Sequence, residues 1–284
     1  MTYSDPALAL ARFIEGHQSI FVLTGAGCST ESGIPDYRDS AGQWKRKPPV
    51  TWQAFSGDEQ TRSRYWARSM IGWRAFRQAE PNSVHVALST LERSGRLSLL
   101  VTQNVDGLHQ RAGHQSVVDL HGRLDTVICL ACGSRTQRQR HQQRLEELNP
   151  DWLSHSAATA PDGDADLDAV DFSDFQIPDC QRCGGMLKPD VVFFGETVPR
   201  NRVELAMAAL YRSDAMLVLG SSLMVYSGFR FARTAAERGI PIAAVNLGTT
   251  RADPLLSLKI NAPCSESLAP WATPVAGQFH TSPA

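Results

Sequence analysis

The sequence predicts an α/β fold in which a smaller zinc-binding domain is inserted into a doubly wound, parallel, Rossmann-like sheet. Short apolar runs alternate with helical stretches along most of the chain, as expected for a parallel sheet with helices on both faces. This alternation stops in residues 129–187, which contain two Cys-x-x-Cys pairs. With 284 residues, 42% of them hydrophobic, the chain can bury the core of one large domain or two smaller ones.

The first predicted elements are a helix, a buried strand and a long loop. Residues 6–15 are expected to form the helix, because Asp5 can cap it and Pro6 suits its first position. Residues 19–23 are a short run rich in β-branched and aromatic residues that leads into a glycine turn, which is typical of a buried strand. Residues 29–50 are rich in Gly, Pro, Ser and Asp and predict a long ordered loop of the kind that usually has a function.

The elements that follow alternate in type. The predicted helices are residues 61–77, 81–93, 203–211 and 228–238, and the predicted strands are residues 97–102, 117–120, 216–219 and 240–245. We therefore expect residues 1–128, with an inserted helical segment near 40–78, and residues 188–268 to form the two parts of the Rossmann-like domain. Residues 129–187 are expected to form the zinc-binding module with an acidic insertion, and residues 269–284 a flexible tail.

Three predicted strand ends carry glycine and small polar residues. Gly25-Ala26-Gly27 matches a dinucleotide-binding turn, where glycines let the backbone approach a pyrophosphate. The usual third glycine is absent, since residue 30 is Thr, so a plain tight turn is the alternative. Gly220-Ser221-Ser222 and Asn246-Leu247-Gly248 follow two further strands. The carboxyl ends of parallel strands meet at one edge, so the three turns together predict a nucleotide site.

Amide, carboxylate and imidazole groups follow the strand at 97–102. Asn104 and Asp106 come directly after it, and His121 ends the next apolar run. A histidine has an unperturbed pKa near neutrality and can act as a general base, although a lone histidine is more often structural. The position of His121 at a strand end favours the catalytic role. His85, His109 and His114 are expected to make local hydrogen bonds only.

The paired cysteines predict a tetrahedral zinc site made by Cys129, Cys132, Cys180 and Cys183. Two disulfides or a redox dithiol are the alternatives. A closed site of four thiolates leaves no open position, so the metal would hold the fold and would not catalyse. The remaining Cys28 and Cys264 are expected to be small buried hydrophobic residues.

Charge and hydropathy exclude several classes of protein. The formal net charge is −1, which argues against binding to nucleic acid or to an anionic membrane. No apolar run approaches the ~18 residues of a membrane span. The first 18 residues lack a secretory pattern. We expect a cytoplasmic monomer. The acidic stretch with Asp162, Asp164, Asp166 and Asp168 lacks the glycine and closing glutamate of a calcium loop and is expected to be exposed.

Taken together, the motifs resemble the sirtuins, NAD-dependent protein-lysine deacylases, in the family's order over roughly residues 5–268. The matching segments are Gly25 to Ser29, Gly33 to Arg38, Thr102 to His109, His121-Gly122, the two cysteine pairs, Lys188 to Glu196, Gly220 to Ser222 and Asn246 to Gly248. Four features are most similar to class II sirtuins: Tyr37, the sequence Val-Val-Phe-Phe-Gly-Glu, the long gap between the cysteine pairs, and residues 64–68. Cys28 departs from the Ile that is common there.

The resemblance implies NAD and zinc as cofactors and acyl-lysine proteins or peptides as substrates. His121 would be the general base, with Asn104 also catalytic. The NAD-binding residues would be Gly25, Ala26, Gly27, Ser29, Asp36, Tyr37, Arg38, Gln103, Asn104, Asp106, Gly220, Ser221, Ser222, Asn246, Leu247, Gly248 and Cys264. The substrate peptide would pair with the edge formed by Val192, Phe193, Phe194, Gly195 and Glu196. The products would be nicotinamide, free lysine and O-acyl-ADP-ribose.

The acyl group and the exact reaction leave alternatives. Tyr65 and Arg68 have a spacing that some sirtuins use to hold acidic acyl chains, and residues i and i+3 share a helix face. Alternatively, Tyr65 packs in the core and Arg68 makes a surface salt bridge, and neither holds an acyl chain. We hypothesise a preference for acidic or longer acyl chains over acetyl. Mono-ADP-ribosyl transfer to protein would use the same NAD site. A non-catalytic NAD sensor and a hydride-transferring dehydrogenase are further alternatives.

Overall fold

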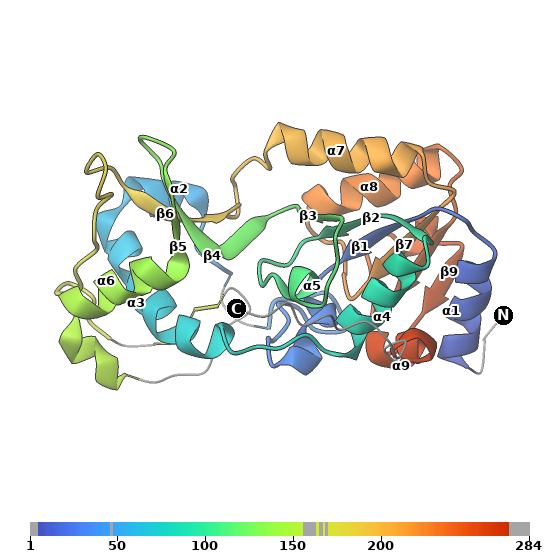
Figure 1. The fold of residues 1–284 in the computed structure, drawn as a ribbon, viewed down its shortest axis with the longest axis horizontal. Helices are drawn as coiled ribbons and strands as arrows, with labels where there is room; N and C mark the ends of the chain where they lie inside the picture. Colours follow the sequence, from blue (N-terminus) through green and yellow to red (C-terminus); the bar gives the residue numbers. More distant parts are fainter. Residues whose placement is uncertain (1–4, 46–47, 156–162, 165–166, 168–169, 273–284) are drawn as a thin grey trace, which may run out of the picture.

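The computed structural model describes residues 5–45, 48–155, 163–164, 167 and 170–272. The chain forms an elongated molecule with two sheets lying side by side (Figure 1). A six-stranded sheet has the order β3-β2-β1-β7-β8-β9, and a three-stranded sheet has the order β5-β4-β6. This arrangement confirms the predicted α/β class.

The large sheet is parallel throughout. Its strands are β1 (Ile20–Thr24), β2 (Leu97–Thr102), β3 (Val117–Asp119), β7 (Ala215–Leu219), β8 (Ile242–Val245) and β9 (Leu258–Ile260). β1, β7 and β8 are buried along their whole length because helices cover both faces. The strand order reverses between β1 and β7. Open α/β sheets bind their ligands at such a switch point.

Two groups of helices cover this sheet. On one face lie α1 (Pro6–Glu15), α4 (Ser83–Arg93) and α9 (Cys264–Leu268), whose Leu10, Leu88 and Leu268 are fully buried. On the other lie α7 (Arg200–Tyr211) and α8 (Tyr226–Glu237), which bury Leu210 and Phe231 (Figure 1). The short α5 (Leu108–Arg111) follows β2.

The predicted first helix begins as expected. The Asp5 side chain accepts hydrogen bonds from the backbone N–H groups of Ala7 and Leu8, at 2.9 and 3.2 Å, and Pro6 occupies the first position of α1. Asp5 therefore satisfies two of the amides that a helix start leaves without partners. The cap and the proline together confirm the predicted start of the helix.

The small sheet is antiparallel. It consists of β4 (Gly122–Cys129), β5 (Arg135–Gln137) and β6 (Leu187–Val191). Three helices pack with it: α2 (Trp52–Gly57), α3 (Glu59–Phe76) and α6 (Arg138–Leu148). Trp66 of α3 is fully buried there, and the Arg138 guanidinium carbon lies 5.5 Å from its ring centroid. The helices near residues 52–76 thus belong to the core of the small sheet.

One sequence expectation was wrong within this region. Asp164 was expected to be exposed, but it is 1% exposed. It is near enough to the buried Arg138 to raise the pKa of that guanidinium, although burial dominates and lowers it to about 10. Asp162, Asp166 and Asp168 lie outside the described residues, as do residues 273–284 of the predicted tail. Residues 269–271 form a 3-10 turn, and Trp271 packs against the core beneath the large sheet.

In the part of the chain that the structure describes, none of the helices combines the length and the apolar character that crossing a bilayer requires.

Candidate active site

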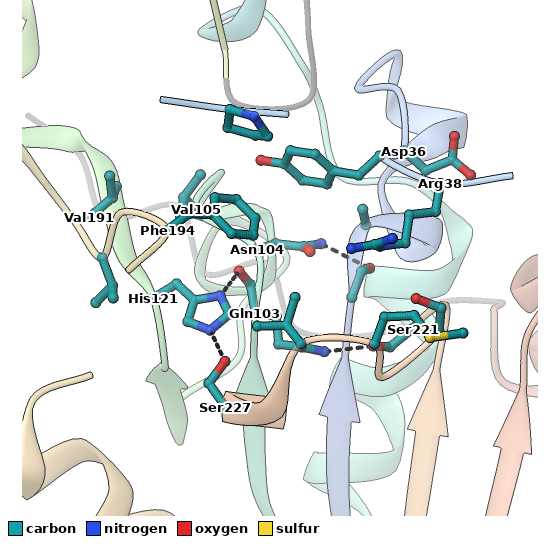
Figure 2. Close-up of a pocket in the computed structure, with 18 of the residues that line it drawn as sticks. Asp36, Arg38, Gln103, Asn104, Val105, His121, Val191, Phe194, Ser221 and Ser227 are labelled. Carbon is teal, nitrogen blue, oxygen red and sulfur yellow. Dashed lines mark hydrogen bonds between the residues drawn. The ribbon is translucent and has the colours of Figure 1, made fainter. Parts of the chain in front are cut away.

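A cavity of about 490 Å³ lies where the two sheets meet. Its walls come from the carboxyl ends of β1, β2, β7 and β8, from residues 34–44 and 49–50, and from the segment that follows β6 (Figure 2). Most of the residues expected to bind NAD line it: Gly25, Ala26, Gly27, Ser29, Asp36, Tyr37, Arg38, Gln103, Asn104, Asp106, Gly220, Ser221, Ser222, Asn246 and Leu247. Gly248 and Cys264, both within the described part of the chain, do not.

The glycine turn is held against the end of β7. The Gly25 N–H donates to the Leu219 oxygen at 3.0 Å, and the Gly27 N–H donates to the Gly220 oxygen at 2.9 Å. A Cβ on Gly25 would lie 2.8 Å from that Gly220 oxygen. The backbones approach so closely that side chains at these positions would separate the two strand ends. A 3-10 turn follows at Ala26–Cys28, and Thr30, which stands at the position of the usual third glycine, begins a second 3-10 turn at Thr30–Ser32.

Amide and hydroxyl groups form a network under the turn. Asn104 Nδ2 donates to the Gly25 oxygen at 3.1 Å and to Ser29 Oγ at 3.0 Å. Ser29 in turn donates to Asp106 Oδ2 at 2.8 Å, and burial is the main cause that raises the pKa of Asp106. Gln103 Nε2 donates to Ser221 Oγ at 2.7 Å. These bonds join the ends of β1, β2 and β7 and fix the orientation of both amides.

His121 follows β3 and faces the cavity between Gln103 and Ser227 (Figure 2). Its Nδ1 lies 3.0 Å from the Gln103 backbone oxygen, and its Nε2 lies 2.8 Å from Ser227 Oγ. Burial lowers the pKa of His121 from 6.5 to about 4, and the charges of Arg202 and Arg230 act in the same direction. The ring is therefore neutral near pH 7 and able to accept a proton. Ser227 was not predicted from the sequence, because a serine in the first turn of a helix carries no distinctive signal.

The loop at residues 33–38 closes one side of the cavity. Asp36 pairs with Lys45, whose Nζ lies 2.5 Å from its Oδ1. The Arg38 guanidinium lies 3.9 Å from the centroid of the Trp44 ring and donates to the Gly42 oxygen at 2.8 Å. The contacts of Lys45 and Trp44 were not predicted from the sequence.

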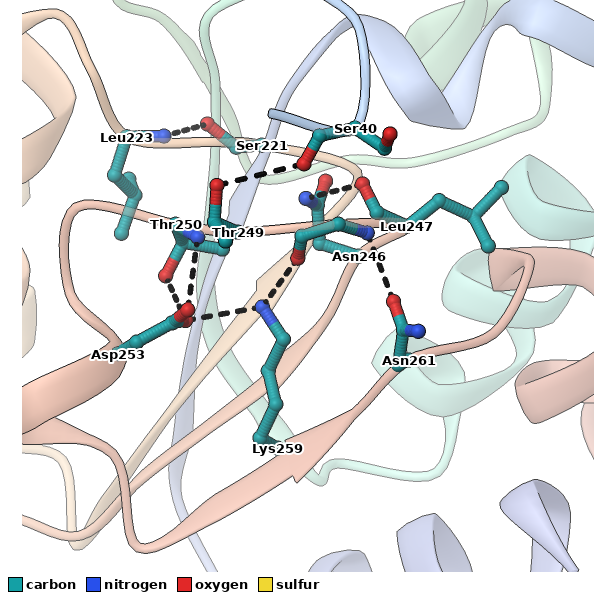
Figure 3. Close-up of polar contacts among 11 residues, drawn as sticks. Ser40, Ser221, Leu223, Asn246, Leu247, Thr249, Thr250, Asp253, Lys259 and Asn261 are labelled. Carbon is teal, nitrogen blue, oxygen red and sulfur yellow. Dashed lines mark hydrogen bonds and ion pairs between the residues drawn. The ribbon is translucent and has the colours of Figure 1, made fainter. Parts of the chain in front are cut away.

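A second polar network holds the loop between β8 and β9 (Figure 3). Lys259 of β9 donates from Nζ to the Gly248 oxygen at 2.9 Å and to Asp253 Oδ1 at 3.0 Å. The Gly248 N–H donates to Asn261 Oδ1 at 2.8 Å. The Thr249 N–H donates to the Ser40 oxygen at 2.9 Å. Gly248 thus supports the loop that presents Asn246 and Leu247 to the cavity.

The segment expected to pair with a peptide lines the opposite wall. Val192, Phe193, Phe194, Gly195 and Glu196 all border the cavity. The Phe194 oxygen accepts from the Trp52 N–H at 2.8 Å. Glu196 Oε2 accepts from the Phe193 N–H and from Lys188 Nζ, each at 2.9 Å. The Glu196 carboxylate thus stabilises the turn at residues 193–196 and pairs with the buried Lys188.

Of the two residues expected to hold the acyl chain, Tyr65 borders the cavity and Arg68 does not. Tyr65 is 3% exposed and borders the cavity, with its ring in edge contact with Phe55 and Phe193. Arg68, which is also described, is not among the residues that line the cavity.

The four paired cysteines converge at one end of the small sheet. The sulfurs of Cys129, Cys132, Cys180 and Cys183 all lie within 4.8 Å of one another. The Cys129–Cys183 and Cys132–Cys180 sulfur distances are 3.5 and 3.8 Å, far beyond the ~2.05 Å of a disulfide, so the disulfide alternative is wrong. Four sulfurs converging on one point suit tetrahedral zinc, which these residues would hold as a structural ion.

Comparison with known proteins identifies the family. The sequence model of the Sir2 family matches residues 25–227. The chain belongs to the Sir2 family. The predicted resemblance to sirtuins is thereby confirmed.

Several relatives within the family match nearly the whole chain. The chain is 62% identical over 261 residues to "NAD-dependent protein deacetylase 2" of Bradyrhizobium diazoefficiens, covering 92% of this chain and 96% of the relative. It is 48% identical over 262 residues to "NAD-dependent protein lipoamidase sirtuin-4, mitochondrial" of Bos taurus, covering 91% and 83%.

Solved Sir2 structures share the fold. "Sir2 bound to acetylated peptide" has a TM-score of 0.71 at 29% identity, covering 92% of this chain and 94% of that one. "Sir2-p53 peptide-NAD+" has a TM-score of 0.71 at 30% identity, covering 92% and 95%. These matches confirm the predicted Rossmann-like architecture.

Proposed function

We propose that this sirtuin is an NAD-dependent protein-lysine deacylase, most similar to class II members, that forms nicotinamide, free lysine and O-acyl-ADP-ribose. The observation that carries the proposal is a neutral, buried His121 facing the cavity that the glycine turn also borders. Relatives named as NAD-dependent protein deacetylases, at 61–62% identity, support it.

We place NAD across the carboxyl ends of β1, β2, β7 and β8. The amides near Gly25 and Gly27, with Ser221, would hold the pyrophosphate, because backbone N–H groups at a glycine turn attract anions. Asn246 would bind the adenosine half. Gly248 and Cys264 remain proposed parts of this half, acting through the backbone or by holding the loop.

NAD supplies a glycosidic bond whose cleavage releases nicotinamide and leaves a ribose carbon open to attack by the acyl oxygen. Asp36 and the 33–38 loop would cover the nicotinamide end. Asn104 and Asp106 would lie beside the ribose. His121 would accept the proton of a ribose hydroxyl, which allows that oxygen to attack the acyl carbon. Such a base contributes about 10²–10⁴-fold to a rate.

Replacement of His121 tests the proposal. His121→Ala should keep the fold and lose NAD-dependent deacylation by about 10²–10⁴-fold, the contribution of a general base. His17→Ala is the matched control, because His17 follows the end of α1, does not border the cavity, and its ring Nδ1 bonds to the Phe13 backbone oxygen. Mass spectrometry would follow loss of the acyl group and would also detect the gain of ADP-ribose that the transferase alternative requires. Equal turnover by wild type and His121→Ala would remove His121 from the reaction.

We further propose that the preferred acyl chain is longer or more acidic than acetyl. Apolar side chains near Tyr65 favour a longer chain: Phe76, Leu124, Val191 and Phe193 all border the cavity. The likeness to a protein named as a lipoamidase points the same way. A panel of acetyl, octanoyl, lipoyl and succinyl peptides tests this, and acetyl as the best substrate would reject it.

Assembly and location complete the proposal. The described residues of one chain supply both walls of the cavity, which is consistent with a monomer. Four reduced thiols at the metal site suit the reducing cytoplasm. Light scattering of the purified protein would test the first statement, and localisation of a tagged chain would test the second.

A further inference from the structure

Ser227 contacts the proposed general base directly. It is the second residue of α8, it borders the cavity, and its Oγ lies 2.8 Å from His121 Nε2. Figure 2 shows it on the side of the imidazole ring opposite Gln103. The sequence motifs that indicate the family and its catalytic residues do not include this serine.

The hydrogen bonds of His121 fix which nitrogen is basic. The Gln103 carbonyl oxygen can only accept, so Nδ1, 3.0 Å away, must carry the hydrogen. In the neutral ring Nε2 is then an acceptor, and Ser227 must donate its hydroxyl hydrogen to it. Nε2 has one lone pair, and Ser227 already occupies it. A ribose hydroxyl can therefore reach this nitrogen only by displacing Ser227 or by passing its proton through Ser227.

Ser227 still has the capacity to accept a proton. Among the described cavity residues, Ser29 Oγ donates to Asp106 and accepts from Asn104, and Ser221 Oγ accepts from Gln103 and from the Leu223 N–H. Within the described residues, Ser227 Oγ makes one hydrogen bond, to His121. A hydroxyl has one donor and two acceptor sites, so both lone pairs of Ser227 are available to a hydroxyl in the cavity.

We propose that Ser227 relays the proton from the ribose hydroxyl to His121. The ribose O–H bond breaks as its proton moves to Ser227 Oγ, and the Ser227 O–H bond breaks as that proton moves to Nε2. The ribose oxygen is left with the electron pair it needs to attack the acyl carbon, His121 becomes an imidazolium, and the serine is regenerated unchanged. This inference rests on the proposed deacylase function.

The test compares two partial reactions in Ser227→Ala. Release and re-addition of nicotinamide precede the step that uses the base, so exchange of labelled nicotinamide into NAD should continue at the wild-type rate. Deacylation should fall about 10–100-fold in kcat, within the range of base catalysis, with KM for NAD unchanged. Ser227→Thr keeps the hydroxyl and should restore deacylation. Thr234→Ala removes a hydroxyl from the same helix at a position that does not border the cavity, and it should behave as wild type.

A proton inventory separates a relay from mere support of the ring. Two protons in transit give a curved dependence of kcat on the deuterium fraction of the solvent in wild type, and a Ser227→Ala variant should give a straight line. A Ser227→Ala enzyme with wild-type kcat and a curved inventory would overturn the relay while leaving the deacylase function intact. Loss of nicotinamide exchange as well would also overturn it, by showing that Ser227 supports the site as a whole. Absence of deacylation in wild type, in contrast, would refute the proposed function itself.

Discussion

Replacement of Gly220 by alanine tests the account of the nucleotide turn. Gly220 follows β7 at the switch point of the sheet and has a φ of +57°. A Cβ at this position would lie 2.5 Å from the Cys28 nitrogen and 2.6 Å from the Gly27 carbonyl carbon. Both are backbone atoms of the turn expected to face the pyrophosphate, so no flexible side chain can move away to make room.

Two costs should add in Gly220→Ala. A left-handed backbone costs a residue with a Cβ about 1–2 kcal/mol, and overpacking costs about 1–3 kcal/mol. The free energy of unfolding should therefore fall by about 2–5 kcal/mol. Relief of the overlap must shift the Gly25–Gly27 turn itself. Because a misplacement of about 1 Å can cost ~10²-fold in rate, kcat/KM for NAD should fall about 10–100-fold.

Gly239→Ala is the matched control. Gly239 has a φ of +71° just after α8, and nothing lies within 4 Å of a Cβ built there. It should lose only the backbone cost of about 1–2 kcal/mol, with NAD kinetics unchanged. Urea unfolding followed by circular dichroism gives the stabilities, and deacylation with NAD varied gives the kinetics. Equal stability losses in both variants, together with wild-type NAD kinetics in Gly220→Ala, would refute the reasoning.

Two further predictions concern the metal site and pH. Chelation should release zinc, as measured with a chromophoric indicator, and should lower the melting temperature, because the ion would hold β4 and the loop before β6 together. The substitution Cys183→Ser should also lower the melting temperature. An unchanged melting temperature would contradict a structural ion. His121 has a pKa lowered to about 4 in the folded chain, so the unfolded chain binds a proton more readily between pH 6.5 and 4, and stability falls as pH falls through that window. Relative to His121→Asn, wild type should lose up to about 3 kcal/mol in its free energy of unfolding across this pH window. Urea unfolding at several pH values measures this loss. A constant difference in the free energy of unfolding between the two proteins would argue against a neutral buried imidazole.

The parallel half of the fold was predictable from local signals. β2 has the predicted bounds, Leu97–Thr102, and α1 begins at its predicted cap. Strands buried on both faces are continuous apolar runs, and helices between them carry their own start signals. Polar residues at the ends of those strands then meet at one edge of the sheet. Asn104, Asp106 and His121 were found for this reason.

The antiparallel half was not predictable in the same way. β4 includes Arg123, Asp125 and Thr126, so it lacks a continuous apolar run. Only four of its eight residues are buried, and those that are apolar join a core that α3 and α6 share. Its partner β6 starts 58 positions after β4 ends (187 − 129), so no local turn signal joins them. The full burial of Arg138, in a helix rich in arginine, depends on Trp66 and Trp73 from a distant helix.

The sequence alone determined the family, the parallel, doubly wound character of the large sheet and the types of residue at its site, because buried strands, caps and paired cysteines are local patterns. Only the tertiary structure decided that Ser227 covers the basic nitrogen of His121 and that Glu196 bonds to Lys188. It also separated Tyr65 from Arg68 relative to the cavity. The reason is physical: a hydrogen bond between residues 106 positions apart depends on where two packed elements bring their side chains, and neither segment encodes that alone.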